Sequence, residues 1–244
     1  MPNRPDRKLC STTFWRGIRV TLVSSAFVCA LVAAAGYFDA DPVHVYAAAP
    51  PASTTVLVNV SGDMGLRFLM GASTSRGLTK RHVTVVGVSS PAVFRRRRTR
   101  AEVDAFVADI IKAALVRTGA RQVYVMGQSY GADVLQTGIA QLPANLRTQV
   151  AGIILVLPGD AVYFRADPTG WSYRGKPDSV ATATVNTLSW VPLTCIYGAE
   201  EEDSLCPHVT VPGAHIVALP GGHNLHHDEG ALVSVVWEAI QGQR

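Results

Sequence analysis

The stretch that decides the fold is Val-Tyr-Val-Met-Gly-Gln-Ser-Tyr-Gly, residues 123–131. The apolar run Gln122–Met126 predicts a buried strand, and the residues from Ser129 to about Gln141 predict a helix. A G-x-S-x-G pattern between a strand and a helix is typical of the sharp turn that carries a nucleophilic serine. The turn is so tight that the residues two places either side of Ser129 must lack side chains. The alternative is a glycine-rich turn with a spare serine.

Backbone amides near Ser129 are predicted to stabilise negative charge. The Tyr130 amide would lie at a helix N-terminus, where free donors and the helix dipole favour an oxyanion. A second donor is expected from the loop after an early strand, Ser61-Gly62-Asp63-Met64-Gly65, whose glycines allow the backbone to approach a substrate closely. The candidates are the amides of Asp63 and Met64, and an ordinary turn is the alternative.

A serine nucleophile needs a general base, and we predict that this base is His223. In this type of fold the order along the chain is nucleophile, acid and histidine. His223 follows an apolar run and the turn Pro220-Gly221-Gly222, as a base at the end of a last strand would. His226 and His227 compete for the role, but we expect them to be polar residues near the start of the last helix.

The acid that orients the base is predicted in the loop after Gly198. The loop reads Ala-Glu-Glu-Glu-Asp-Ser-Leu-Cys-Pro over residues 199–207 and so offers four carboxylates in a row. We prefer Asp203, because a short carboxylate before a turn into Pro207 suits an acid loop. Glu202 and Glu201 remain alternatives.

Alternation of strands and helices along the chain predicts an α/β fold. Thr99 and Glu102 form a capping-box pattern that opens one helix, and another helix is predicted from about Asp228 to Ile240. Continuous apolar runs suit strands that are covered on both faces. The architecture expected is an α/β-hydrolase fold, with a mostly parallel sheet of about six strands, helices on both faces and a short lid insertion at residues 158–190. The strands are predicted at Val56–Val60, His82–Val88, Gln122–Met126, Ala151–Leu157, Pro192–Tyr197 and His215–Leu219.

The first 49 residues predict export. A basic stretch ends at Arg19, an uncharged apolar run covers Val20–Phe38, and three small residues precede Pro50. These are the parts of a secretory signal. The apolar run is also close to the roughly 20 residues that span a bilayer, so it could remain as an N-terminal anchor, although we favour cleavage. Residues 50–244 are then the hydrolase domain, in the periplasm.

Two cysteines outside this segment, Cys195 and Cys206, predict a disulfide, because an even pair in an exported chain tends to be oxidised. The alternative is two buried free thiols. The composition is 48% hydrophobic and 16% charged, which argues against disorder. The first 49 residues carry +2 of the net charge of +4, and the remaining +2 is too small to predict a nucleic-acid partner.

Other charged residues suggest roles in binding. Arg97 and Arg98, in a run of four arginines, are candidates for an anionic lipid headgroup or a membrane surface, with a solvated loop as the alternative. Asp133, four residues after Ser129, could pair with a substrate ammonium group or simply complement the helix dipole. The histidines near His223 lack any zinc-protease spacing, so we expect no metal and no other cofactor.

The chain resembles the bacterial VirJ family and the C-terminal half of AcvB proteins. The likeness covers roughly residues 54–240. It is carried by Ser-Gly-Asp at 61–63, Arg-Arg-Thr at 97–99, G-Q-S-Y-G-A-D-V-L at 127–135, C-I-Y-G-A-E-E-E-D-S-L-C-P at 195–207 and L-P-G-G-H at 219–223.

The resemblance implies a periplasmic α/β-hydrolase with Ser129, Asp203 and His223 as its triad. AcvB-like members are linked to hydrolysis of aminoacylated phosphatidylglycerol, which predicts a lysyl-phosphatidylglycerol hydrolase. VirJ is linked to type IV secretion, which predicts secretion components as partners. The alternatives are an interaction protein on a hydrolase scaffold and a general carboxylesterase that takes a small ester.

Overall fold

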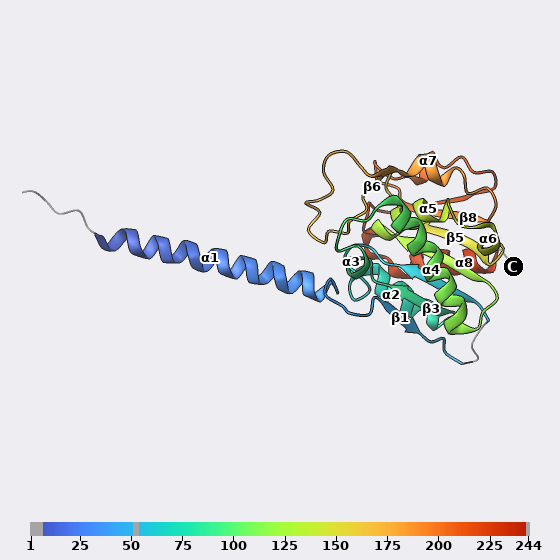
Figure 1. The fold of residues 1–244 in the computed structure, drawn as a ribbon, viewed down its shortest axis with the longest axis horizontal. Coiled ribbons are helices and arrows are strands. Elements are labelled where there is room, and N and C mark those ends of the chain that lie inside the picture. Colours follow the sequence, from blue (N-terminus) through green and yellow to red (C-terminus); the bar gives the residue numbers. More distant parts are fainter. Residues whose placement is uncertain (1–6, 51–53, 243–244) are drawn as a thin grey trace, which may run out of the picture. The chain divides into compact units, whose positions relative to one another are not determined.

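The computed structural model describes residues 7–50 and 54–242 (Figure 1). The chain divides into two compact units between Ala34 and Ala35. The first contains helix α1 (Arg7–Ala34), and the second contains every other element. Among the described residues, no helix has both the length and the hydropathy needed to cross a membrane.

A seven-stranded sheet forms the centre of the second unit, in the order β1-β3-β2-β4-β5-β8-β9. All neighbours are parallel except β1, which runs antiparallel to β3. The α/β-hydrolase fold predicted from the sequence is confirmed, and all six predicted strands are present. The seven strands are β1 (Val43–Tyr46), β2 (Val56–Val60), β3 (Thr84–Val88), β4 (Val123–Gln128), β5 (Val150–Val156), β8 (Leu193–Gly198) and β9 (His215–Leu219).

The additional strand, β1, lies in the segment that the sequence assigned to export. It pairs with β3 in a register that joins Val43 to Val88, and the Ser89 amide donates to the Pro42 carbonyl at 2.8 Å. Ala35 is buried at the start of the same unit. The folded unit therefore begins before residue 50, and a cut after Ala49 would remove an edge strand.

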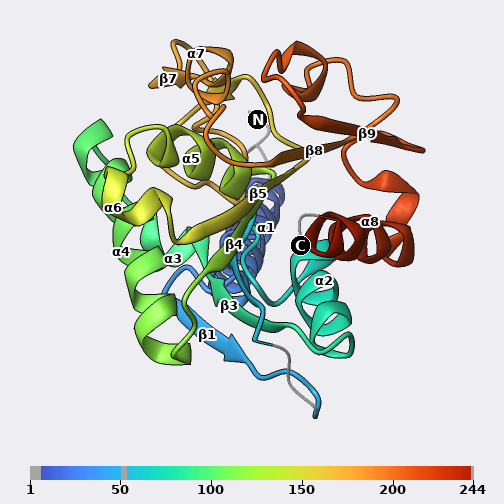
Figure 2. The same cartoon turned by 90° about the vertical axis from the view of Figure 1, so that its right-hand side faces the viewer.

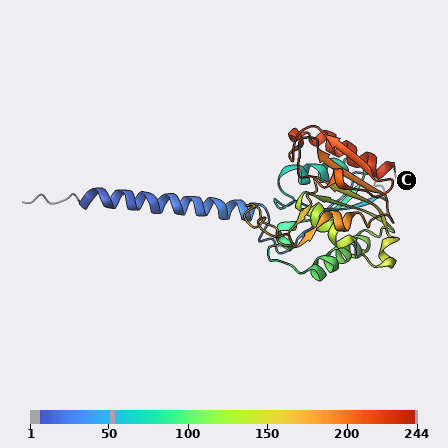
Figure 3. The ribbon, with the colours of Figure 1, turned by 90° about the horizontal axis from the view of Figure 1, so that it is seen from above.

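Helices cover both faces of the sheet (Figures 2 and 3). Helices α2 and α8 lie on one face, and α4 and α5 lie on the other (Figure 2). Each face buries its own apolar cluster, with Phe94 and Ile111 in one and Met126 and Leu232 in the other. The helices are α2 (Leu69–Thr79), α3 (Ser90–Val93), α4 (Arg100–Thr118), α5 (Tyr130–Ile139), α6 (Ala144–Arg147), α7 (Ala181–Val185) and α8 (Glu229–Gln241), with 3₁₀ turns at η1 (Cys206–His208) and η2 (Leu225–His227).

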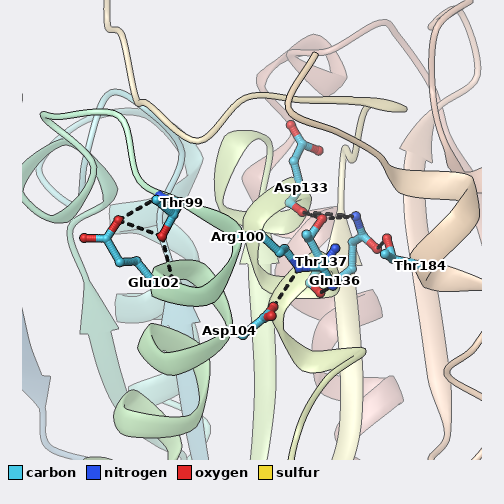
Figure 4. Close-up of polar contacts among 8 residues, drawn as sticks. All are labelled: Thr99, Arg100, Glu102, Asp104, Asp133, Gln136, Thr137 and Thr184. Atoms are coloured by element: carbon cyan, nitrogen blue, oxygen red, sulfur yellow. Dashed lines mark hydrogen bonds and ion pairs between the residues drawn. The ribbon is translucent and has the colours of Figure 1, made fainter.

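The predicted capping box opens helix α4 (Figure 4). The Thr99 hydroxyl accepts from the Glu102 amide at 3.3 Å, and the Glu102 carboxylate accepts from the Thr99 amide at 2.7 Å. These two bonds satisfy donors that the first turn of a helix leaves free. They fix the start of α4 directly after the arginine run.

The insertion after β5 packs over helix α5. It contains a small two-stranded sheet, β6 (Ala161–Val162) with β7 (Ser179–Val180), followed by α7. The Thr184 hydroxyl of α7 donates to the Gln136 side chain of α5 at 2.6 Å (Figure 4). The insertion predicted as a lid is thus fastened to the helix that follows Ser129.

Candidate active site

Ser129 occupies the sharp turn between β4 and α5. Its backbone has φ 50° and ψ −126°, a strained conformation for a residue with a side chain. A Cβ at Gly131 would overlap the Val60 carbonyl, and one at Gly127 would overlap the Gly131 carbonyl. The two glycines of the pattern are therefore required by close backbone approach, as the sequence predicted.

His223 lies against the serine. Its Nε2 is 2.8 Å from the Ser129 Oγ, although the two residues are 94 positions apart in the chain. Strands β4 and β9 are parallel members of one sheet, so their C-terminal ends bring both side chains to the same edge. The distance is that of a hydrogen bond through which an imidazole can take a hydroxyl proton.

The carboxylate beside His223 belongs to Glu201, and the sequence-based preference for Asp203 is corrected. Glu201 Oε1 is hydrogen-bonded to His223 Nδ1. The Glu201 side chain is 7% exposed, whereas Glu202 and Asp203 are exposed residues. The hydrogen bond and charge of Glu201 raise the pKa of His223, against burial, which lowers it.

Backbone bonds explain why Glu201 takes this position. The chain turns at once after β8, because the Glu201 amide donates to the Gly198 carbonyl at 2.9 Å. Its neighbour Glu200 donates its amide to the Gly221 carbonyl at 3.0 Å, in the histidine loop. The acid loop therefore folds against the histidine loop within three residues of β8, too early for Asp203 to be the residue that faces the imidazole.

A disulfide closes the acid loop. Cys195 in β8 is bonded to Cys206 in η1, with the two Cα atoms 5.5 Å apart, so the predicted pairing is confirmed. The Leu205 amide also donates to the Pro158 carbonyl at 2.8 Å. These links hold the far end of the loop between the sheet and the insertion.

The neighbouring histidines, His226 and His227, come just before α8, near the start of the last helix as predicted. His226 Nε2 is 3.6 Å from Glu200 Oε1, and both side chains are largely exposed. His227 ends the 3₁₀ turn before α8 and lines a small cavity that Ser129 and His223 also line. In the described part of the chain, no group of His, Cys, Asp and Glu side chains has the arrangement of a metal site.

The expected oxyanion donors lie next to Ser129. Tyr130 is the first residue of α5, so its amide has no partner within the helix. A Cβ at Gly62 would be 3.6 Å from the Ser129 Cβ, which places the loop of Asp63 and Met64 beside the serine. The Asp63 carboxylate accepts from the Tyr173 hydroxyl of the insertion at 3.1 Å.

Two cavities meet at Ser129 and His223. The larger, of about 790 Å³, extends under the insertion and is lined by Tyr163 and Tyr173. The smaller, of about 190 Å³, lies beside the oxyanion loop. Its lining combines apolar side chains, such as Phe68 and Met70, with polar ones, such as His227 and Glu229. A bond held at Ser129 would therefore have a large space on one side and a small, partly apolar space on the other.

The larger cavity is acidic. Among the residues that the structure describes, its lining has no lysine or arginine but five carboxylates, namely Asp63, Asp133, Asp160, Glu201 and Asp203. Burial raises the pKa of Asp63, although its hydrogen bond to Tyr173 lowers it. Asp160 and Tyr173 could not be predicted as site residues, because the insertion that places them has no recognisable motif.

Asp133 faces this cavity from α5. Its Oδ1 accepts from the Gly159 amide at 2.9 Å, and its carboxylate points away from the polar contacts made by its own carbonyl (Figure 4). Burial raises the pKa of Asp133 well above its ordinary value. A bound cation would oppose that effect, because it would favour the ionised carboxylate.

Arg97 and Arg98 do not line either cavity. Arg97 pairs with Asp178 of the insertion at 2.7 Å. Arg98 donates to the Val93 carbonyl at 3.0 Å and pairs with Glu102 at 3.3 Å. The sequence-based interpretation of these two arginines as substrate-binding residues is therefore not supported by their position, because their charges are used within the protein.

A protein-family comparison matches most of the chain. The family described as bacterial virulence protein (VirJ) matches residues 54–244. No curated protein sequence matches the chain.

Solved structures share the fold at low sequence identity. Est1E from Butyrivibrio proteoclasticus has a TM-score of 0.62 and 14% identity, over 82% of this chain and 93% of that chain. The carboxylesterase CesB (YbfK) from Bacillus subtilis has a TM-score of 0.58 and 13% identity, over 82% and 88%. An alpha-beta serine hydrolase homologue from Coxiella burnetii has a TM-score of 0.58 and 12% identity, over 80% and 88%. At this identity the likeness concerns the fold.

Proposed function

The chain belongs to the VirJ family of bacterial virulence proteins, and from this membership and the site geometry we propose that it is a serine hydrolase of carboxylic esters. The observation that carries the proposal is the chain of hydrogen bonds from Ser129 through His223 to Glu201. A serine, a base and an orienting acid in this order are the parts that acyl transfer needs.

The reaction would proceed through an acyl-enzyme. Ser129 Oγ attacks the ester carbonyl carbon while His223 Nε2 takes its proton, and Glu201 stabilises the imidazolium and fixes its orientation. The amides of Tyr130 and of the Asp63–Met64 loop would hold the oxyanion. His223 then gives the proton to the departing alcohol, and a water molecule, activated in the same way, releases the acid and frees Ser129.

The substrate that we propose is an aminoacyl ester of phosphatidylglycerol, as in lysyl-phosphatidylglycerol. Support comes from the carboxylates of the larger cavity, which suit the ammonium groups of an amino acid. The same carboxylates would repel a phosphate. We therefore assign the aminoacyl group to the acidic cavity and leave the phosphate of the lipid outside it.

A fluorophosphonate probe tests the enzymatic part of the proposal. We expect the full chain to be labelled and the Ser129→Ala variant, shown to be folded by circular dichroism, to remain unlabelled. A folded wild-type protein that resists labelling under all conditions would instead favour an interaction protein on a hydrolase scaffold.

Paired substrates test the aminoacyl preference. We expect kcat/KM for a glyceryl ester of lysine to exceed that for its N-acetylated analogue, which lacks the ammonium charges, by about tenfold or more. Asp133→Asn should reduce this ratio. Asp109→Asn, on the exposed surface of α4, is the matched control and should not. Equal rates with both esters would indicate a general carboxylesterase.

We also propose that the protein works in the periplasm with β1 retained. A disulfide in the acid loop suits an oxidising compartment, and β1 is paired to the sheet upstream of the expected cleavage site. Mass spectrometry of the protein from a periplasmic fraction would give its first residue. A mature chain that begins at or after Pro50 would contradict the retention of β1.

A further inference from the structure

A basic surface with an exposed aromatic side chain is formed by the insertion and the arginine run before α4. We call it the basic face and define it by Arg95, Arg96, Arg165, Trp171, Arg174 and Lys176, all of which are exposed. Trp171 is 72% exposed, and the Arg174 guanidinium lies 4.9 Å from the centre of its ring. A large apolar side chain that is this exposed, with a cation against it, is more typical of a binding surface than of a surface that faces only water.

Backbone bonds bring these residues together from two distant segments. The Arg98 amide donates to the Phe164 carbonyl at 2.8 Å, and the Ala166 amide donates to the Phe94 carbonyl at 2.9 Å. The arginine run and the start of the insertion are thereby joined side by side. The ion pair between Arg97 and Asp178 joins the same run to the end of the loop that carries Lys176.

The cations of the basic face form no ion pair with any carboxylate in the described part of the chain. Arg97 and Arg98, which lie between the joined segments, have carboxylate partners. Among the described residues, the ion pairs include none of the five cations that define the face. Their positive charge therefore remains available to a partner.

A second aromatic side chain lies next to this surface. The Tyr37 hydroxyl donates to the Arg95 carbonyl at 2.7 Å, and Phe38 packs edge-on against the Tyr37 ring. Phe38 is 66% exposed. Apolar rings set among cations match the boundary between headgroups and acyl chains, where aromatic side chains gather and basic ones meet anionic lipid.

We propose that the basic face docks on an anionic phospholipid bilayer. Tyr173 and Pro177, which line the acidic cavity, lie between Trp171 and Asp178 in the same loop, so docking would bring the cavity close to the lipid headgroups. The inference rests on the proposed function only in explaining why docking would be useful, because a lipid substrate would be found at the bilayer. The docking itself requires no turnover.

The acidic cavity and the basic face place charges of opposite sign in two separate regions. Carboxylates line the cavity, and cations lie on the loop outside it. A lipid phosphate would be held at the basic face while a cationic group esterified to the lipid enters the cavity. A soluble polyanion would be attracted by the cations as well, but it would give no reason for the two exposed rings.

Quenching of Trp171 by brominated lipid tests the proposal in the full-length Ser129→Ala protein, in which no turnover can occur. Vesicles of phosphatidylglycerol with brominated phosphatidylcholine are compared with vesicles of brominated phosphatidylcholine alone. Subtracting the signal of the same protein with Trp171→Phe isolates this residue from the other tryptophans. We expect Trp171 to be quenched strongly in the anionic vesicles and several-fold less in the zwitterionic ones.

A matched pair of variants locates the effect. Each basic side chain near an anionic surface contributes about fivefold to binding. Replacing Arg95, Arg96 and Arg165 with Gln should therefore remove most of the Trp171 quenching. The control replaces Lys112, Arg117 and Arg121 with Gln. These are equally exposed cations on α4 and just beyond it, where the chain enters β4 at the sheet edge opposite Ser129, and this variant should be quenched like the parent protein.

Two results would overturn the proposal. One is a full-length protein that binds anionic vesicles while Trp171 remains unquenched, because the chain would then be held by another part and the basic face would point to water or to a protein. The other is equal loss of quenching in both triple variants, because net charge alone would then explain the attraction. Neither result bears on labelling of Ser129, which tests the proposed function separately.

Discussion

The nucleophile turn and the acid loop supply two parts of the same site in opposite ways. The nucleophile turn, residues 127–131, is defined by local geometry: two glycines are needed wherever a strand turns this sharply into a helix. The acid loop, residues 198–206, is defined by contacts with distant segments, namely the histidine loop, the insertion and Cys195. A pattern in the sequence can reveal the first kind of position but not the second.

The largest expected effect, a change in kcat/KM, is in the acid loop. Replacing Glu201 with Gln should lower kcat/KM for an ester by about 10³–10⁴-fold, because the imidazolium that forms during attack loses its stabilising carboxylate. Asp203→Asn in the same loop is the matched comparison and should change kcat/KM by less than about tenfold. Steady-state kinetics with a soluble ester give both values.

The pH profile separates this positioning role from a structural one. His223 must be neutral to act as a base, so kcat/KM should rise with pH through the His223 pKa, which Glu201 raises. Without the carboxylate that pKa falls, and the acidic limb of the Glu201→Gln profile should move to lower pH. If Asp203→Asn moved the limb instead, Asp203 would be the orienting acid and the assignment of Glu201 would be wrong.

In the nucleophile turn, the stability of the protein should be sensitive to a larger side chain rather than to the loss of a charge. A methyl group at Gly131 would overlap the Val60 and Ser61 carbonyls, so Gly131→Ala should lower the free energy of unfolding by about 3–5 kcal/mol. Gly159→Ala is the control, since a Cβ there has open space around it. Chemical denaturation of both variants would measure the difference, and equal stabilities would contradict the close approach.

Sequence reasoning succeeded where the structure depends on neighbouring residues. The six parallel strands, the capping box at Thr99, and Ser129 at its turn all follow from local patterns. His223 could be predicted because a histidine after the last strand needs only the order of the elements. Glu201 could not be chosen from four adjacent acids, since the choice depends on backbone bonds to Gly198 and Gly221.

Two other features were beyond the sequence for the same physical reason. Strand β1 was hidden, because its four residues follow an apolar run that predicts export, and only pairing with β3 reveals it. The acidic cavity was also hidden. Asp133 stands out in the sequence as an acid four residues after Ser129, but Asp160 joins it in one cavity only when the insertion folds over α5.

The disulfide should stabilise the acid loop more than it affects chemistry. Closing a loop with a sequence separation of 11 residues contributes about 3 kcal/mol by the chain-entropy relation. Replacing Cys195 and Cys206 with Ser should therefore lower the free energy of unfolding by about that amount, as measured by denaturation in urea. Cys29→Ser, which removes an exposed free thiol, should have no such effect. If the cysteine replacement changed stability no more than Cys29→Ser does, backbone contacts such as that to Pro158 would be enough to hold the loop.

Asp133→Asn is predicted to have the smallest effect on stability, and this substitution should stabilise the fold rather than destabilise it. Burial raises the pKa of Asp133 in the folded state, so the folded protein binds a proton more tightly than the unfolded chain does, and ionising the carboxylate at neutral pH destabilises the fold. Asp133→Asn removes that cost and should raise the free energy of unfolding at pH 7 by about 1–2 kcal/mol. The gain should disappear below the unfolded pKa of about 4, where both states are protonated.

Thermal melts at pH 7 and at pH 3.5, with Asp109→Asn as the exposed control, would measure this gain in stability. A variant that loses stability at pH 7 would mean that Asp133 is ionised and held by partners, so that the cavity is acidic even without a cation. A variant that gains stability but loses the preference for ammonium esters would show a carboxylate kept for binding at the expense of the fold.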